Sequence, residues 1–321
     1  MVTSLAAIGR EVALLLPAPP VLGFPPHNFQ GKLPPCNPSI FINGSFFYQS
    51  QTSYPAIATR ASALPIMSTM PASHGHNEAC CNIPPVVSSG YEAKGTYKEI
   101  GGYKTYVTGP LDAKKAIVVI YDIFGYFDQT LQGADILAFS DAHNKYKVFI
   151  PDWFQGKPCP IEWYPPNTDE KKKNLGEFFG TYPPPKIAGL VPDYVKAVLE
   201  QDSSISKTGI LGYCWGGKVV ALTTKADTNP FSVAASIHPA MVDAADAEGI
   251  KTPTILLASK EEPDEEVKKF ENALAGPKHV ETFKDQIHGW MAARADLSDD
   301  RVKEEYERGY KTVLKFFGEN F

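Results

Sequence analysis

Residues 208–218 read Thr208-Gly209-Ile210-Leu211-Gly212-Tyr213-Cys214-Trp215-Gly216-Gly217-Lys218. The first six are mainly apolar and predict a strand, and residues 217–224 are expected to form a helix. A cysteine joins the two elements, with a glycine two residues away on each side. A strand that passes into a helix through so tight a turn leaves no room for a Cβ atom at Gly212 or Gly216. The turn should hold Cys214 at a helix N-terminus, where the helix dipole favours a thiolate.

A strand, Gly-x-nucleophile-x-Gly and a helix form the nucleophile elbow of α/β-hydrolases, here with cysteine in the serine position. The chain around it alternates between strands and helices. Strands are expected at 97–100, 103–107, 116–121, 146–150, 208–213, 232–237, 254–258 and 279–283, and helices at 131–142 and 192–199. A closing amphipathic helix is predicted from Val302, Tyr306, Tyr310, Val313 and Phe317. The fold class is therefore α/β, an α/β-hydrolase fold with a mostly parallel central sheet flanked by helices.

A cysteine nucleophile needs a base, which follows it along the chain in this fold. The candidates are His238, His279 and His288. His238 ends a strand, where it could equally form a wall, and His279 begins one. His288 follows the last strand in a polar loop and precedes the closing helix, so we take His288 as the base.

A carboxylate should orient the imidazole from the loop after the preceding strand. The segment Glu261-Glu262-Pro263-Asp264 follows the strand at 254–258. Any of its three carboxylates could serve, or the segment could be an acidic helix start in solvent. We select Glu261, the first acid after the strand, and keep Asp264 as the alternative.

The composition limits the class of protein. Of the 321 residues 43% are hydrophobic and 21% are charged, which suits a folded domain. The net charge of −5 argues against binding to nucleic acid, and no apolar window is long enough to span a membrane. Five cysteines do not suggest a disulfide framework. We therefore expect a cytoplasmic enzyme with no nucleic-acid or membrane partner, as a monomer or weak homodimer.

The N-terminal part differs from the rest. Residues 1–69 hold 10 of the 28 prolines and a single acid, Glu11, which predicts a low-order leader. The leader could be a transit peptide, giving a mitochondrial location, or an extension upstream of a start at Met70. Residues 70–94 are expected to be an extended entry segment to the domain at 95–321. The histidines and cysteines of residues 74–81 have the wrong spacing for a zinc site, so no metal is expected there.

From about Met70 onward the chain resembles the dienelactone hydrolase family, and more closely its fungal branch. The resemblance rests on Tyr121-Asp122-Ile123-Phe124-Gly125, Pro151-Asp152-Trp153-Phe154, the elbow at Cys214 and His288-Gly289-Trp290. It implies a Cys-His-Asp triad that falls on Cys214, His288 and Glu261, with glutamate replacing aspartate. It also implies a carboxylate that hydrogen-bonds the resting thiol. That carboxylate is Asp122 here, where the enzymes acting on dienelactone have glutamate.

The resemblance implies a hydrolase that cleaves a small ester or lactone through an acyl-thioester, as in a carboxymethylenebutenolidase, with no metal or organic cofactor. The N–H groups of Trp215 and Ile123 are expected to bind the oxyanion. Aromatic residues of 153–164 and Trp290 should line an apolar pocket, and Arg294 is the nearby candidate for binding a substrate carboxylate. The alternatives are a thioesterase or general carboxylesterase with the same triad, and a pseudo-hydrolase that binds a small molecule or senses redox state through Cys214.

Overall fold

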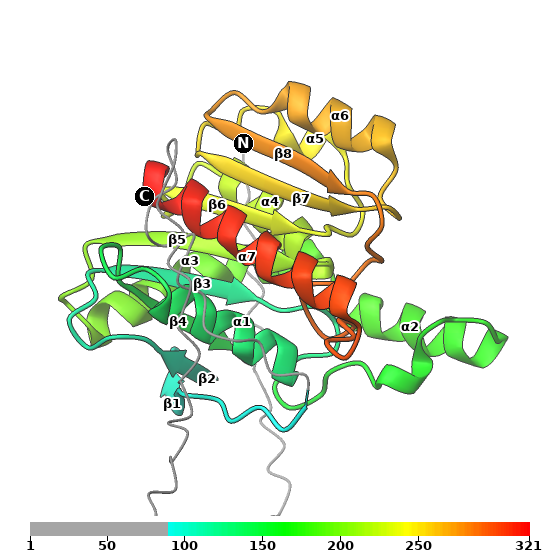
Figure 1. Cartoon of the computed structure of the whole chain (residues 1–321), viewed down its shortest axis with the longest axis horizontal. Helices are drawn as coiled ribbons and strands as arrows, with labels where there is room; N and C mark the ends of the chain where they lie inside the picture. Colours follow the sequence, from blue (N-terminus) through cyan, green and yellow to red (C-terminus); the bar gives the residue numbers. More distant parts are fainter. Residues whose placement is uncertain (1–88) are drawn as a thin grey trace, which may run out of the picture. The chain divides into compact units, whose positions relative to one another are not determined.

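A computed structural model describes residues 89–321, which form one eight-stranded sheet in the order β1-β2-β4-β3-β5-β6-β7-β8 (Figure 1). The first two strands run antiparallel to their neighbours and the others are parallel. The strands are β1 (Thr96–Ile100), β2 (Tyr103–Thr108), β3 (Lys115–Ile120), β4 (Tyr146–Pro151), β5 (Lys207–Tyr213), β6 (Val233–Ile237), β7 (Thr254–Ser259) and β8 (Lys278–Phe283). This sheet confirms the predicted α/β-hydrolase class.

Helices cover both faces of the sheet. They are α1 (Asp128–Phe139), α2 (Asp169–Thr181), α3 (Pro184–Gln201), α4 (Trp215–Lys225), α5 (Ala244–Ala247), α6 (Asp264–Ala273) and α7 (Asp300–Asn320), with a short 3-10 turn, η2 (Ile161–Trp163). Helices α1 and α7 lie on one face, and α3 and α4 pack together on the other (Figure 1). The segment with α2 extends beyond the sheet at the edge where the parallel strands end (Figure 1).

The apolar patterns of the sequence correspond to the core. All five residues of β3 after Lys115 are buried, as expected for a strand covered on both faces. On α7, the predicted apolar face contains Tyr306, Tyr310 and Phe317, each fully buried against the sheet. The two elements at the centre of the fold thus form for the reason that their sequence suggests.

Residues 151–188, where no strand or helix was expected, are partly helical. They contain all of α2 and the first turn of α3, which begins at Pro184, eight residues before the start predicted at Pro192. Prolines at the first positions of a helix remove no helical hydrogen bond, because the N–H groups that they lack would have no acceptor within the helix. The proline run therefore marks a helix start and not a loop.

Residues 1–88 lie outside the described part of the chain, and so do the expectations for the leader, for most of the entry segment and for the histidines and cysteines of 74–81. Within residues 89–321, none of the helices is both long enough and apolar enough to cross a bilayer.

Candidate active site

Cys214 lies on a strained turn between β5 and α4. Its backbone has φ 52° and ψ −116°, which a residue with a side chain rarely adopts. A Cβ atom at Gly212 would overlap the carbonyl oxygen of Gly216, and one at Gly216 would overlap that of Ile120. The steric reason for the two glycines is therefore visible as backbone packed on backbone. The turn is tied to β6 by a hydrogen bond from the N–H of Cys214 to the carbonyl of Ile237, at 3.0 Å.

His288 lies beside Cys214, in the loop that follows β8. Its Nδ1 atom is 2.6 Å from Oε1 of Glu262, and 17% of its side chain is exposed. Burial lowers the pKa of His288, but hydrogen bonds with the Cys214 thiol and with Glu262 outweigh it and raise the pKa to about 10. The imidazole therefore favours its protonated form between a sulfur and a carboxylate. The structure thus brings Cys214 and His288 together, as the sequence predicted.

The carboxylate at His288 is Glu262, and the prediction of Glu261 was wrong. Strand β7 ends at Ser259, one residue later than expected, and the second acid after it, Glu262, is the one that turns toward His288. Ser259 directs that side chain inward, because its backbone N–H and its hydroxyl both donate to the Glu262 carboxylate. A glutamate three residues after a serine can reach back to the serine N–H, and this spacing of Ser259 and Glu262 could have identified Glu262.

The two rejected carboxylates point elsewhere. The Glu261 side chain is 41% exposed, and its Oε2 lies 4.0 Å from a guanidinium nitrogen of Arg294. Asp264, the alternative, is exposed in the first turn of α6, where a negative charge is favourable to the helix dipole.

The other two histidines are separate from this contact. His279 lies on β8, is 44% exposed and pairs with Glu281 at 3.5 Å. His238 is fully buried, with its ring centroid 5.1 Å from that of His288. Burial sets the pKa of His238 well below 6.5, and the charge of His288 adds to this effect, so His238 is neutral beside a protonated neighbour.

Asp122 does not have the predicted contact with the thiol. Its Oδ1 accepts a hydrogen bond from the N–H of Phe124 at 2.9 Å, and its Oδ2 accepts one from the N–H of Ala293 at 3.2 Å. Both oxygens are thus directed at backbone, and the hydrogen bonds of Asp122 within residues 89–321 do not include Cys214. Burial raises the pKa of Asp122 to about 6, although both N–H groups oppose the rise. The residue joins the turn after β3 to the loop that follows His288.

The two residues expected to bind the oxyanion both lie near the sulfur. Trp215 is the first residue of α4, so its N–H has no acceptor one helical turn earlier. Its indole donates to the carbonyl of Tyr182 at 3.1 Å and packs against the ring of Phe154, which fixes the side chain. Ile123 lines the same cavity as Cys214, and its carbonyl accepts from the N–H of Cys159 at 2.8 Å.

A cavity of about 500 Å³ opens over Cys214 and His288. Helix α2 supplies part of its wall through Leu175 and Phe179, which the sequence had not suggested. Of the aromatic residues in 153–164, Tyr164 lines the cavity, whereas Trp153 and Phe154 are buried in the core. The wall is thus formed by an inserted helix more than by the aromatic run.

Trp290 was wrongly predicted to line this pocket. It is fully buried, its ring centroid lies 4.2 Å from that of Phe283, and its ring would contact any Cβ atom at Gly309 of α7. Trp290 therefore anchors the loop of His288 to the core.

Arg294 does line the cavity, with 22% of its side chain exposed. One guanidinium nitrogen donates to the carbonyl of His288, and the group lies over the ring of Tyr164 at 4.7 Å. Its carbon stem packs on Gly289 and leaves no space for a Cβ atom there, and the φ of 99° at this position also favours glycine. Arg294 thus holds the histidine loop as well as facing the cavity.

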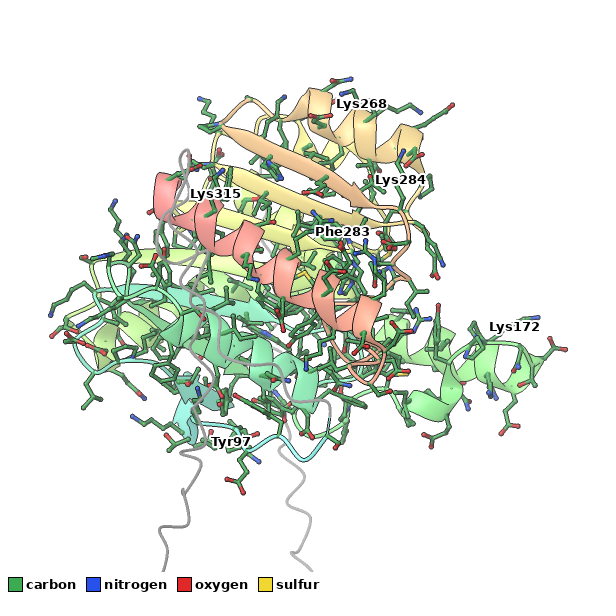
Figure 2. All side chains as sticks on the ribbon, viewed as in Figure 1. Tyr97, Lys172, Lys268, Phe283, Lys284 and Lys315 are labelled. Atoms are coloured by element: carbon green, nitrogen blue, oxygen red, sulfur yellow. The ribbon has the colours of Figure 1, made fainter. Side chains whose placement is uncertain are left out.

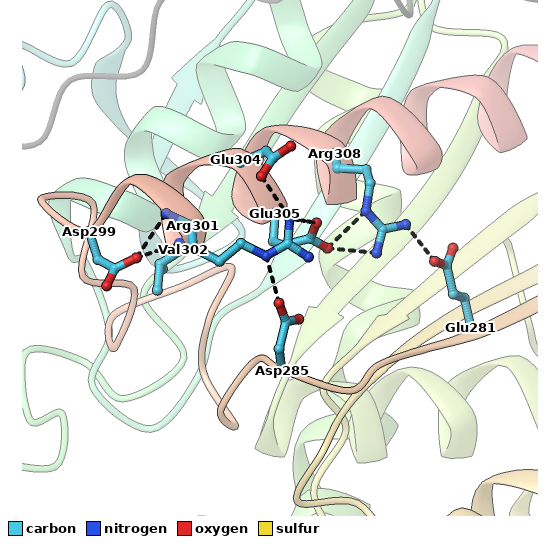
Figure 3. Close-up of polar contacts among 8 residues, drawn as sticks. All are labelled: Glu281, Asp285, Asp299, Arg301, Val302, Glu304, Glu305 and Arg308. Atoms are coloured by element: carbon cyan, nitrogen blue, oxygen red, sulfur yellow. Dashed lines mark hydrogen bonds and ion pairs between the residues drawn. The ribbon is translucent and has the colours of Figure 1, made fainter.

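Charged side chains of α7 secure the same loop from outside (Figure 3). Arg301 contacts Asp285, three residues before His288, at 2.6 Å. Arg308 pairs with the buried Glu305 and with Glu281, and its guanidinium lies 3.8 Å from the centre of the Phe283 ring. Within residues 89–321, no group of three or more histidine, cysteine, aspartate or glutamate side chains is arranged to hold a metal ion.

Comparison with known proteins assigns the family. Residues 103–321 match the model of the dienelactone hydrolase family. An uncharacterized AIM2 family protein of Schizosaccharomyces pombe is 38% identical over 236 residues, which cover 71% of this chain and 92% of that protein. A carboxymethylenebutenolidase homolog of Rattus norvegicus is 28% identical over 237 residues, covering 70% and 91% of the two chains.

The crystal structure of dienelactone hydrolase from Anabaena variabilis superposes with a TM-score of 0.51 at 12% identity, covering 72% of this chain and 98% of the other, and so supports the fold. This chain therefore belongs to the dienelactone hydrolase family and is a hydrolase.

Proposed function

We propose that this protein hydrolyses carboxylic esters or lactones, as a carboxymethylenebutenolidase-like enzyme would, with Cys214 as nucleophile, His288 as proton carrier and Glu262 as the residue that orients the imidazole. The observation that carries the proposal is the contact of these three side chains at the base of a cavity. Glu262 lies 2.6 Å from Nδ1 of the imidazole, and the same imidazole is hydrogen-bonded with the Cys214 thiol. Hydrolases that form an acyl-enzyme have this arrangement, in which the nucleophile contacts a base and the base contacts an orienting acid.

The reaction begins with the thiol proton on His288, because the raised pKa of the imidazole favours that form. The Cys214 thiolate attacks the substrate carbonyl, and the backbone N–H groups of Trp215 and Ile123 bind the oxyanion. When the tetrahedral intermediate collapses, His288 gives its proton to the departing alkoxide, and an acyl-thioester remains on Cys214. Neutral His288 then takes a proton from water, which attacks the thioester and releases the acid.

The test compares the wild type with Cys214→Ala on p-nitrophenyl acetate and on dienelactone. We expect the substitution to lower kcat/KM at least about 1000-fold, since loss of a nucleophile leaves only binding and the oxyanion site. Activity that persists in Cys214→Ala would refute the proposal. Far-UV circular dichroism of both proteins shows that the variant is folded.

A further inference from the structure

The cavity over Cys214 is walled mainly by apolar side chains. Ile123 and Phe124 come from the turn after β3, Leu175 and Phe179 from α2, and Met241 and Val242 from the loop after β6. Two of these remain unusually open to solvent for large apolar groups, Phe179 at 38% and Met241 at 51%. They come from different elements and face one cavity, so an apolar ligand there would cover surface that water now contacts.

The apolar surface continues beyond this cavity. A second hollow of about 350 Å³ shares Phe124, Tyr164 and Arg294 with it and adds Ile161, which is 46% exposed on η2. The outer side of α2 is different in character. Its charged residues point outward, as Lys172 does at the tip of the helix (Figure 2). Helix α2 thus presents its apolar side to the cavity and its polar side to solvent.

The charges in the cavity do not favour an anion. Its lining includes two acids, Glu261 and Glu262, and two basic residues, His288 and Arg294, beside Cys214 and Tyr164. Each cation already has an anionic neighbour, since Glu262 is 2.6 Å from His288 and Glu261 is 4.0 Å from Arg294. One nitrogen of Arg294 is also engaged by the His288 carbonyl, and one face of the guanidinium by Tyr164. A substrate carboxylate would have to displace Glu261 from Arg294, in a lining whose two cations are already balanced by two acids.

We infer that the preferred substrates are neutral esters with an extended apolar group, and that a carboxylate on the substrate lowers the rate. This inference rests on the proposed function of the same site and specifies its substrate class. The apolar group lies along Phe179 and Met241 while the carbonyl carbon reaches Cys214. Arg294 then serves mainly to hold the histidine loop, and it contributes little to binding an anion.

Chain length is tested with p-nitrophenyl acetate and p-nitrophenyl hexanoate. Each fully buried methylene increases binding about fourfold, so partial burial of four predicts a kcat/KM for hexanoate at least about tenfold above that for acetate. Phe179→Ala should reduce this ratio by about threefold or more, because it removes part of the wall. Phe139→Ala is the matched control, since Phe139 is a 43% exposed phenylalanine on α1 outside the cavity lining. A ratio near one in the wild type, or equal effects of the two substitutions, would overturn the inference.

Charge is tested with two esters of similar size, p-nitrophenyl pentanoate and the p-nitrophenyl monoester of glutaric acid. We expect the neutral ester to have a kcat/KM at least about tenfold higher. Glu261→Gln should narrow the difference by about fivefold, because it removes a carboxylate near Arg294. An anionic ester that reacts as fast as the neutral one contradicts the inference.

A binding measurement separates this inference from the proposed function. Hexanamide and glutaramate, which are not esters, are compared as protectants of Cys214 against alkylation by iodoacetamide. The inference predicts protection by hexanamide at a concentration at least about tenfold lower. Stronger protection by glutaramate would overturn the inference even if every ester were inert. Active Cys214→Ala together with preferential hexanamide protection would refute the proposed chemistry and leave the ligand class standing.

Discussion

The position of Glu262 can be tested against that of its neighbours. We predict that Glu262→Gln damages the enzyme far more than Glu261→Gln, and that Asp264→Asn leaves it unchanged. Glu262 is buried and contacts the imidazole, Glu261 is 41% exposed beside Arg294, and Asp264 is exposed at the start of α6. The three substitutions remove the same charge within four positions of the chain, so each serves as a control for the others.

The magnitude follows from the imidazole. The rise in the pKa of His288 from 6.5 to about 10 corresponds to roughly 5 kcal/mol in favour of its protonated form. Burial opposes that rise, so Glu262 and Cys214 together supply at least this much. Glu262 supplies the smaller share, after Cys214, and a share of about 2 kcal/mol corresponds to a loss of about 30-fold in kcat/KM.

The assay is kcat/KM for a neutral p-nitrophenyl ester as a function of pH. The pKa of His288 is raised, so its protonated form persists above neutral pH and is lost only as the pH approaches about 10. In Glu262→Gln the alkaline limb of the profile should move toward neutral pH, because the neutral amide no longer stabilises the imidazolium. A larger loss in Glu261→Gln, or an unchanged alkaline limb in Glu262→Gln, would refute this assignment.

Three further predictions concern stability, measured by urea unfolding. Gly216→Ala should lower the free energy of unfolding by about 3 kcal/mol or more, because the added Cβ atom overlaps backbone. Gly176→Ala on α2, where a Cβ atom meets nothing within 4 Å, should raise it by about 0.5–1 kcal/mol. Equal effects of the two substitutions would contradict the packing around Gly216. Burial raises the pKa of Asp122 from 3.8 to about 6. The free energy of unfolding of the wild type should therefore fall by up to about 3 kcal/mol as the pH rises from about 4 to about 6. Asp122→Asn should remove this pH dependence, whereas substitution of the exposed Asp128 by Asn should leave it unchanged. Parallel curves of unfolding free energy against pH for the wild type and Asp122→Asn would show that burial of Asp122 is not the cause. Arg308→Ala should lower the free energy of unfolding by about 1–2 kcal/mol, because Arg308 stacks on Phe283 and pairs with buried Glu305. Arg301→Ala should have a smaller effect, because 53% of that side chain is exposed, although Arg301 also contacts Glu305 at 2.9 Å. The opposite ranking would count against the arrangement in Figure 3.

The parts that could be predicted from sequence are those governed by local sterics and periodicity. Any chain that turns as tightly as the elbow at Cys214 requires glycine at the positions of Gly212 and Gly216. In the structure, backbone atoms occupy the space that a Cβ atom would need at each of them. The all-apolar run of β3 and the apolar face of α7 depend on spacing alone. His288 followed from chain order, which the fold constrains.

The parts that could not be predicted depend on a single residue of register or on tertiary contacts. Glu261 and Glu262 are adjacent residues of the same type. The end of β7 at Ser259, which hydrogen-bonds Glu262, decides which of the two side chains faces inward. Trp290 follows His288 by two positions, yet the loop turns it into the core against Phe283. Asp122 has a chemistry that suits a thiol, but the nearby N–H groups of Phe124 and Ala293 take both of its oxygens. The cavity wall on α2 comes from a proline-rich segment that has little periodicity to reveal it.

In the proposed reaction, an acyl group is carried transiently by Cys214. To detect it directly, the enzyme is quenched in acid during turnover of p-nitrophenyl hexanoate and digested with a protease. The mass of the peptide that contains Cys214 is then measured by mass spectrometry. We expect the mass of one hexanoyl group on that cysteine, removed by hydroxylamine and absent from Cys214→Ala. Turnover with no acyl group on Cys214, or with the group on another residue, would contradict the account.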